Sequence, residues 1–238
     1  MSPATLFGLG VGPGDPELIT LKAARILAGV DAVAYVSAGG RPSRARAIAD
    51  AHIRPGVSEI ELVLPMAVDP ASAAPAYAAG ADRIVAILDA GRDVAVLCEG
   101  DPLLYGSFAR LLAHLDDRIG GRHRVQIVPG ITSISAAIAS SGHPLVGRLE
   151  PMTIVPAPLA CADLDAHLGQ GDAVVVMKLG RHLERVRAAL ARAGRLTGAL
   201  YVEAASTEDE RVLPLSELAS APAPYFSLVL VPPVRGAR

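Results

Sequence analysis

Aromatic residues are scarce in this chain of 238 residues, at 3% of the sequence, and tryptophan is absent. Proteins that stack single-stranded nucleic acid need aromatic platforms, so this class is not expected. The 22 basic and 24 acidic residues give a net charge of −2, which offers no general attraction for nucleic acid or an anionic membrane. We therefore expect neither nucleic acid nor a membrane as a partner.

Cysteine is also rare, and Cys98 and Cys161 lie far apart in apolar surroundings. This pattern predicts neither a disulfide framework nor a zinc cluster. The histidines show no spacing typical of metal ligands, so no bound metal is expected. The chain has no apolar run long enough to cross a membrane and does not open with a signal-like segment. These absences predict a cytoplasmic globular protein.

Hydrophobic residues are abundant, at 51% of the sequence, and they alternate between short strand-like and longer helix-like segments. This alternation indicates an α/β fold of two domains with mainly parallel sheets. A polar, glycine-rich stretch places the expected boundary between domains 1–120 and 121–238. The predicted strands are 5–11, 32–36, 58–62, 93–98, 124–128, 152–155, 173–177, 199–203 and 225–231, and the predicted helices are 17–28, 43–51, 71–90, 107–115, 131–140, 162–168 and 183–193.

The first candidate site follows the strand at 5–11, in the sequence Gly8-Leu-Gly-Val-Gly-Pro-Gly-Asp-Pro16. Glycines between a strand and a helix let backbone N–H groups approach a ligand. The dinucleotide-binding fingerprint needs glycine where Pro13 stands, which argues against a nicotinamide-dependent oxidoreductase. The alternative is a structural turn, with Asp15 capping a helix that begins at Pro16.

The second candidate site is Cys98-Glu-Gly-Asp-Pro-Leu-Leu-Tyr-Gly-Ser107, directly after a buried strand. Ligands of open α/β sheets bind beyond the carboxyl ends of strands. Gly100-Asp-Pro102 predicts a sharp turn there, whose backbone carbonyls would face a cationic ligand. An ordinary capped turn is the alternative.

The third candidate site is Val128-Pro-Gly-Ile-Thr-Ser-Ile-Ser135, where another strand gives way to a helix. Thr132 and Ser133 lie near the predicted helix start. Their hydroxyl groups either cap that helix or contact a carboxylate of a ligand.

Taken together, three sequences resemble the tetrapyrrole C-methyltransferases of corrin and sirohaem biosynthesis. They are Gly8-x-Gly-x-Gly-Pro-Gly-Asp-Pro-x-Leu-Ile-Thr20, Glu99-Gly-Asp-Pro102 and Pro129-Gly-Ile-Thr-Ser133. The resemblance extends over essentially the whole chain. Segments 43–48, 98–108, 177–180 and 224–228 are most similar to the branch of the family that methylates C20 of precorrin-2.

The resemblance implies two α/β domains with an active-site cleft between them, a homodimer, a tetrapyrrole substrate and S-adenosyl-L-methionine as methyl donor. It also implies a set of cofactor contacts at matching positions. These are Pro13, Glu99, Gly100, Asp101, Leu104, Thr132, Ser133, Met177, Ala205 and Ser227.

Methyl transfer from a sulfonium to an electron-rich carbon needs no protein nucleophile, which agrees with the lack of a hydrolase nucleophile motif in the sequence. Arginine forks suit the acetate and propionate groups of a tetrapyrrole. Arg41, Arg44 and Arg46 are the candidate substrate contacts, with solvated surface charge as the alternative. Tyr105 is the candidate catalytic residue, for macrocycle contact or proton removal, with plain packing as the alternative.

Three other functions are alternatives to methylation at C20. A sibling enzyme of the same family would methylate a different ring carbon. A sensor would bind S-adenosylmethionine without turnover, and an oxidoreductase would need a nicotinamide cofactor. The sequence leaves open whether the substrate is metal-free precorrin-2 or cobalt-factor II.

Overall fold

The computed structural model describes residues 3–65, 70–219 and 222–234. The chain divides into two compact units between Thr132 and Ser133. The boundary expected after residue 120 falls inside the first unit. The reason is that strand β5 (Arg124–Val128) pairs with β1 (Thr5–Gly10) and completes the first sheet.

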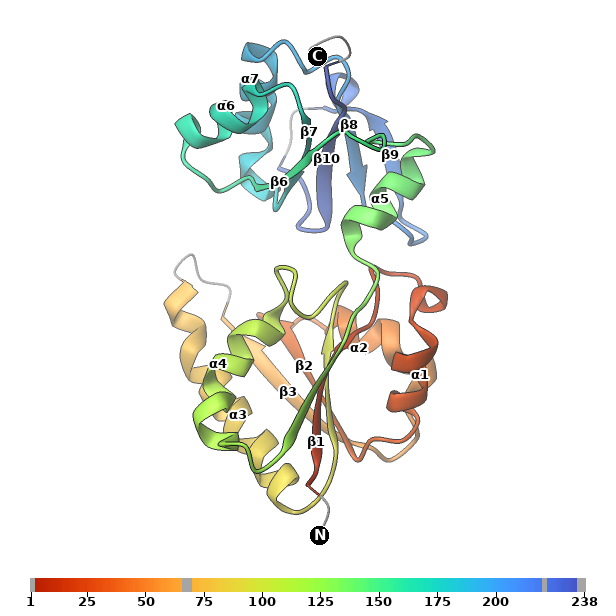
Figure 1. Cartoon of the computed structure of the whole chain (residues 1–238), viewed down its shortest axis with the longest axis vertical. Coiled ribbons are helices and arrows are strands. Elements are labelled where there is room, and N and C mark those ends of the chain that lie inside the picture. Colours follow the sequence, from red (N-terminus) through yellow and green to blue (C-terminus); the bar gives the residue numbers. More distant parts are fainter. Residues whose placement is uncertain (1–2, 66–69, 220–221, 235–238) are drawn as a thin grey trace. The chain divides into compact units, whose positions relative to one another are not determined.

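The first unit contains a parallel sheet with helices on both faces (Figure 1). Its strand order is β3-β2-β4-β1-β5, so β3 and β5 are the edge strands. Apolar side chains of α1 and α2 pack on one face, and those of α3 and α4 pack on the other. The further bounds are β2 (Ala32–Ala38), β3 (Ser58–Leu64), β4 (Val94–Cys98), α1 (Leu21–Leu27), α2 (Arg44–Ala49), α3 (Ala74–Asp89) and α4 (Ser107–Ile119).

The second unit also has a sheet covered on both faces, with strand order β6-β7-β10-β8-β9. Among its described residues only β6 and β7 pair in parallel, and the other three pairings are antiparallel. The α/β class is confirmed, but the expectation of parallel strands holds for the first sheet and not for this one. The bounds are α5 (Ser133–Ser141), β6 (Met152–Pro156), α6 (Cys161–Gly169), β7 (Ala173–Met177), α7 (Leu183–Arg192), β8 (Leu200–Glu203), β9 (Arg211–Pro214) and β10 (Ser227–Val231).

The helix predicted over residues 17–28 is divided in two by its capping residues. Asp15 accepts a hydrogen bond from the Glu17 N–H at 2.8 Å and caps a short 3₁₀ turn that begins at Pro16. Thr20 then has extended backbone and its hydroxyl caps α1 by accepting from the Ala23 N–H. The structural interpretation of Asp15 is therefore confirmed, for a shorter helix than expected.

The two cysteines are free thiols in different surroundings. Burial raises the pKa of the Cys98 thiol to about 12, so this thiol stays protonated and unreactive at neutral pH. Within the described ranges, no three metal-ligating side chains gather into a cluster. The helices in the same ranges are all too short or too polar to span a bilayer.

Candidate functional site

Three neighbouring strands of the first sheet end side by side and carry the three candidate motifs. β1 lies between β4 and β5, with Gly10 opposite Cys98 and Leu9 opposite Val128. Because the strands are parallel, the loops that follow them all leave from the same edge. We call this edge, with loops 11–15, 99–106 and 129–132, the β4–β1–β5 edge. It is the position at which open α/β sheets bind ligands.

The backbones of the three loops contact one another at glycine residues, which have no side chain to keep them apart. A Cβ atom on Gly10 would lie 2.5 Å from the Gly130 nitrogen and 2.7 Å from the Gly100 carbonyl oxygen. The Gly100 N–H also donates to the Gly12 carbonyl at 2.7 Å, and Gly12 has a left-handed backbone with φ of 83°. The Gly100 carbonyl is thus packed against protein backbone. The expectation that carbonyls of this turn face a cationic ligand stays a prediction.

Asp101 links two of the loops with its carboxylate. One carboxylate oxygen accepts from the N–H groups of Leu103 and Leu104, at 2.9 and 3.2 Å. The other accepts from the Gly130 N–H at 3.1 Å. A charged acceptor strengthens each of these hydrogen bonds. The side chain therefore holds the second and third loops of the β4–β1–β5 edge together.

The tip of the second loop presents apolar side chains to solvent. Leu103, Leu104 and Tyr105 are 55%, 40% and 47% exposed. Tyr105 also has a positive φ of 57°, a conformation that a bulky residue adopts only at some cost and that is frequent at binding sites. An exposed apolar cluster at a strand end marks a surface suited to a partly apolar ligand.

The remaining predicted cofactor contacts near this edge differ in how far solvent reaches them and in the unit to which they belong. Pro13 is buried, whereas Thr132 is half-buried at the end of the third loop. Ser133 is the first residue of α5 and belongs to the second unit. Thr132 is thus the polar side chain that the third motif contributes to the first unit's edge.

Glu99 has a side chain that turns toward α2. Burial raises the pKa of its carboxyl, whereas the positive charge of Arg44 and a hydrogen bond from the Ala45 N–H act in the opposite direction. Arg44 is half-buried and Arg41 is exposed. Of the two, Arg44 is the arginine that lies within electrostatic reach of the β4 strand end.

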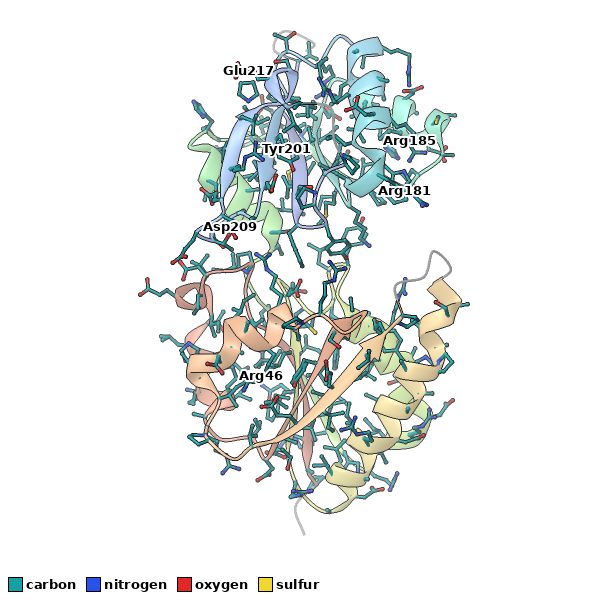
Figure 2. All side chains as sticks on the ribbon, turned by 180° about the vertical axis from the view of Figure 1, so that it is seen from behind. Arg46, Arg181, Arg185, Tyr201, Asp209 and Glu217 are labelled. Carbon is teal, nitrogen blue, oxygen red and sulfur yellow. The ribbon has the colours of Figure 1, made fainter. Side chains whose placement is uncertain are left out.

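Arg46 lies on α2 (Figure 2), and other protein groups bind its guanidinium. Its guanidinium donates to the Glu59 carboxylate at 3.0 and 3.1 Å and to Asp50 at 2.7 Å. Glu59 also accepts from the Tyr35 hydroxyl at 2.7 Å. This network ties α2 to β2 and β3, so Arg46 is accounted for as a structural residue.

The network makes stability depend on pH at Glu59. The hydrogen bond from Arg46, reinforced by Tyr35, holds the pKa of Glu59 below its usual value, although burial opposes the shift. Its stabilising effect is therefore present above the unfolded-state pKa of about 4.3 and is lost as the pH falls through the lower folded-state pKa. We expect Glu59→Gln to lower the thermal midpoint at pH 7, and we expect this deficit to shrink as the pH falls through that lower pKa. A difference that stays constant with pH would contradict this account.

The second unit brings its predicted residues to one edge of its own sheet. Met177 ends β7 opposite Leu228, and Ser227 begins β10 opposite Glu203. Ala205 follows β8 within a tight turn. Three residues at this edge have positive φ without being glycine, namely Lys178 (58°), Ala204 (49°) and Ser206 (67°). Such strain gathers at ligand-binding loops.

Ser227 itself is buried, with 6% of its surface exposed, and its hydroxyl donates to the Pro224 carbonyl at 2.6 Å. Tyr201 lies on the neighbouring strand β8 (Figure 2). Its hydroxyl donates to Glu203 at 2.7 Å and also interacts with Ser227. Burial and the bond to Glu203 raise the pKa of Tyr201 to about 12. Tyr201 and Glu203 are not identified from the sequence as neighbours of Ser227. Their spacing could have indicated a contact between them, because residues two apart on a strand share one face.

Comparisons with known proteins agree with the geometry. A family described as Tetrapyrrole (Corrin/Porphyrin) Methylases matches residues 5–219. The cobalamin biosynthesis protein CobIJ of Mycobacterium tuberculosis is 46% identical over 96% of this chain, which spans about half (46%) of that relative's length. A Sinorhizobium precorrin-2 C(20)-methyltransferase is 40% identical, with 95% of this chain and 94% of that protein covered.

Among solved structures, uroporphyrin-III C-methyl transferase from Thermus thermophilus, complexed with S-adenosyl homocysteine, has a TM-score of 0.67 and 26% identity. The match covers 96% of this chain and 92% of that one. The family match covers most of the sequence, and the Sinorhizobium relative matches over nearly its full length. The chain therefore belongs to the tetrapyrrole methylase family.

Proposed function

We propose that this protein transfers a methyl group from S-adenosylmethionine to carbon C20 of precorrin-2 or its cobalt-containing counterpart, in cobalamin biosynthesis. The observation that carries the proposal is the likeness to the Sinorhizobium precorrin-2 C(20)-methyltransferase over nearly the whole of both chains. The complex of the Thermus thermophilus relative with S-adenosyl homocysteine supports the choice of methyl donor.

The β4–β1–β5 edge fits such a donor. S-adenosylmethionine has a flat aromatic purine, whose faces suit apolar contacts, joined to polar and charged groups. The edge offers the exposed apolar side chains of Leu103 and Leu104 in the second loop and the half-buried hydroxyl residue Thr132 in the third. The second unit would contribute Met177, Ala205 and the backbone around Ser227. When bound, the donor supplies an electrophilic methyl group on its sulfonium.

The protein's part in this reaction is positioning. Holding two reactants in line is worth up to about 7–11 kcal/mol of the barrier. The Asp101 carboxylate fixes the loops that would orient the donor, and Arg44 would hold a substrate carboxylate. Arg41 is retained as a weaker candidate because it is exposed. Tyr105, exposed at the loop tip, would contact the macrocycle or accept the proton that leaves the methylated carbon.

The test is a paired anaerobic assay with the purified protein and S-adenosylmethionine. One vessel receives precorrin-2 and the other cobalt-factor II, and mass spectrometry with NMR locates any new methyl group. Methylation at C20 in one vessel supports the proposal and identifies the form of the substrate. Methylation at another carbon would assign a sibling activity, and donor binding without turnover on either substrate would favour a sensor.

We further propose that the enzyme is a cytoplasmic homodimer, as the family resemblance implies. Sedimentation velocity at several protein concentrations tests the dimeric state. A stable species with twice the monomer mass is expected, and a monomer at all concentrations would contradict the proposal.

A further inference from the structure

A buried hydroxyl without a partner lies at the carboxyl end of β2. Ser37 is 2% exposed, and its Oγ has no hydrogen-bond partner within the described part of the chain. Leaving a buried polar group unpaired costs free energy, and native proteins do so rarely. Neither the predicted cofactor contacts nor the ion pairs of the first unit include this hydroxyl. Its position therefore needs a functional explanation.

Strand pairing indicates that Ser37 and Glu99 lie on the same side of the sheet. β2 and β4 pair in parallel as far as Ala34 opposite Val96. Extending this register by three residues, past the end of β4 at Cys98, would bring position 37 opposite position 99. Side chains alternate between the faces of a sheet. Val33 and Leu97 both pack on the face that α1 and α2 cover, and Ser37 and Glu99 have the same parity as these two. The hydroxyl and the carboxyl thus belong to the same face of the sheet.

The Glu99 side chain is held on this face by groups of α2. The Ala45 N–H donates to it, and the charge of Arg44 stabilises its ionised form against the cost of burial. Its backbone, in contrast, leads directly into Gly100, whose N–H is fixed by the loop at Gly12. Glu99 therefore connects two parts of the first unit. Its backbone belongs to the predicted donor-binding loop, and its side chain interacts with Arg44.

We propose that Glu99 is a positioning residue that orients Arg44 toward a carboxylate of the tetrapyrrole, and that Ser37 donates to Glu99 when Arg44 engages the substrate. This inference rests on the proposed function. A guanidinium has five N–H donors and can serve two carboxylates at once. When Arg44 also binds a substrate carboxylate, Glu99 loses part of the charge interaction with Arg44 that it has in the free protein. In this proposal a hydrogen bond from the Ser37 hydroxyl to Glu99 compensates for that loss.

Two single variants test the roles of the carboxylate and the hydroxyl. Only the backbone of Glu99 belongs to the predicted donor-binding loop, and Glu99→Gln keeps that backbone. For this variant we expect a KM for the tetrapyrrole about tenfold higher, with kcat and the affinity for S-adenosylhomocysteine changed much less. For Ser37→Ala we expect a KM about threefold higher and an unchanged or raised thermal midpoint, because the removed hydroxyl has no partner in the free protein. Arg25→Ala, an exposed arginine of α1, is the control and should leave KM unchanged.

A double variant tests whether Glu99 acts through Arg44. Arg44→Lys keeps the charge but loses the fork, and it should raise KM by about as much as Glu99→Gln. If both residues serve one interaction, the pair of changes together should raise KM little more than either alone. Effects that multiply would show that the two residues act independently and would overturn the positioning role.

A binding measurement separates this inference from the proposed function. Uroporphyrin, a stable macrocycle with acetate and propionate groups, can be titrated by fluorescence into each variant. If the parent protein methylates neither tetrapyrrole, the proposed function fails, yet weaker uroporphyrin binding by Glu99→Gln and Ser37→Ala would still support the positioning role. Parent-like KM and uroporphyrin affinity in both folded variants would overturn it, as would a selective loss of S-adenosylhomocysteine affinity in Glu99→Gln.

Discussion

Replacing Asp101 with alanine is expected to weaken S-adenosylhomocysteine binding by about a hundredfold, equivalent to about 2.7 kcal/mol. The carboxylate accepts hydrogen bonds from three backbone N–H groups, two in its own loop and one at Gly130. Alanine leaves all three without that acceptor, and hydrogen bonds to a charged group are each worth about 1.5–3 kcal/mol. The second and third loops then lose their link. Isothermal titration calorimetry on the folded variant measures the loss.

Asparagine at position 101 is the matched comparison. Its single amide oxygen can serve the Leu103 and Leu104 N–H groups but presents an NH₂ group toward the Gly130 N–H. We expect its affinity to lie between those of the parent protein and Asp101→Ala. Circular dichroism confirms that both variants are folded. Parent-like affinity in Asp101→Ala would show that the link between the loops is not needed for binding.

Gly130→Ala is expected to reduce both stability and donor binding, because the loops meet there without side chains. A Cβ atom on Gly130 would overlap the Gly100 carbonyl oxygen and lie 2.8 Å from the Gly10 Cα. Neither neighbour is the end of a flexible side chain, so the backbone must move. Overpacking of this kind costs about 1–3 kcal/mol. We expect a lower thermal midpoint and at least a roughly tenfold loss of S-adenosylhomocysteine affinity.

Gly169→Ala provides the control for adding a methyl group to a glycine. Gly169 is the last residue of α6, and a Cβ atom there meets nothing within 4 Å. Alanine is favoured over glycine in helices by about 0.5–1 kcal/mol, so this variant should be as stable as the parent or more stable. If Gly130→Ala behaved like Gly169→Ala, close backbone approach would not be the reason for glycine at position 130.

The first unit could be predicted well from the sequence because its signals are local. Apolar strands ending in glycine-rich motifs pointed to three strand ends as the candidate site. Parallel pairing then places those ends at one edge. The use of Asp101 as a link to Gly130 could not be read from the sequence, since the two residues are 29 positions apart and their contact depends on the order of the strands.

The second unit was predicted less well because strand direction is not encoded in apolar character. β10 reads as a buried strand whether its neighbours are parallel or antiparallel, and its two pairings are antiparallel. The four-residue strand β9 gave too short a pattern to be recognised. Likewise, three arginines near α2 looked equivalent in sequence. The structure distinguishes them because Glu59 and Asp50 lie within reach of Arg46.

The late position of β5 in the chain has a consequence for folding during synthesis. β1 emerges from the ribosome well before its partner strands, whose paired residues begin only at Val94 and Arg124. Contacts so distant in sequence form slowly, and β1 must wait for most of the first unit to be translated. Once Thr132 has left the exit tunnel, every hydrogen-bond donor to Asp101 is present. The β4–β1–β5 edge can then assemble while the ribosome is still adding the second unit.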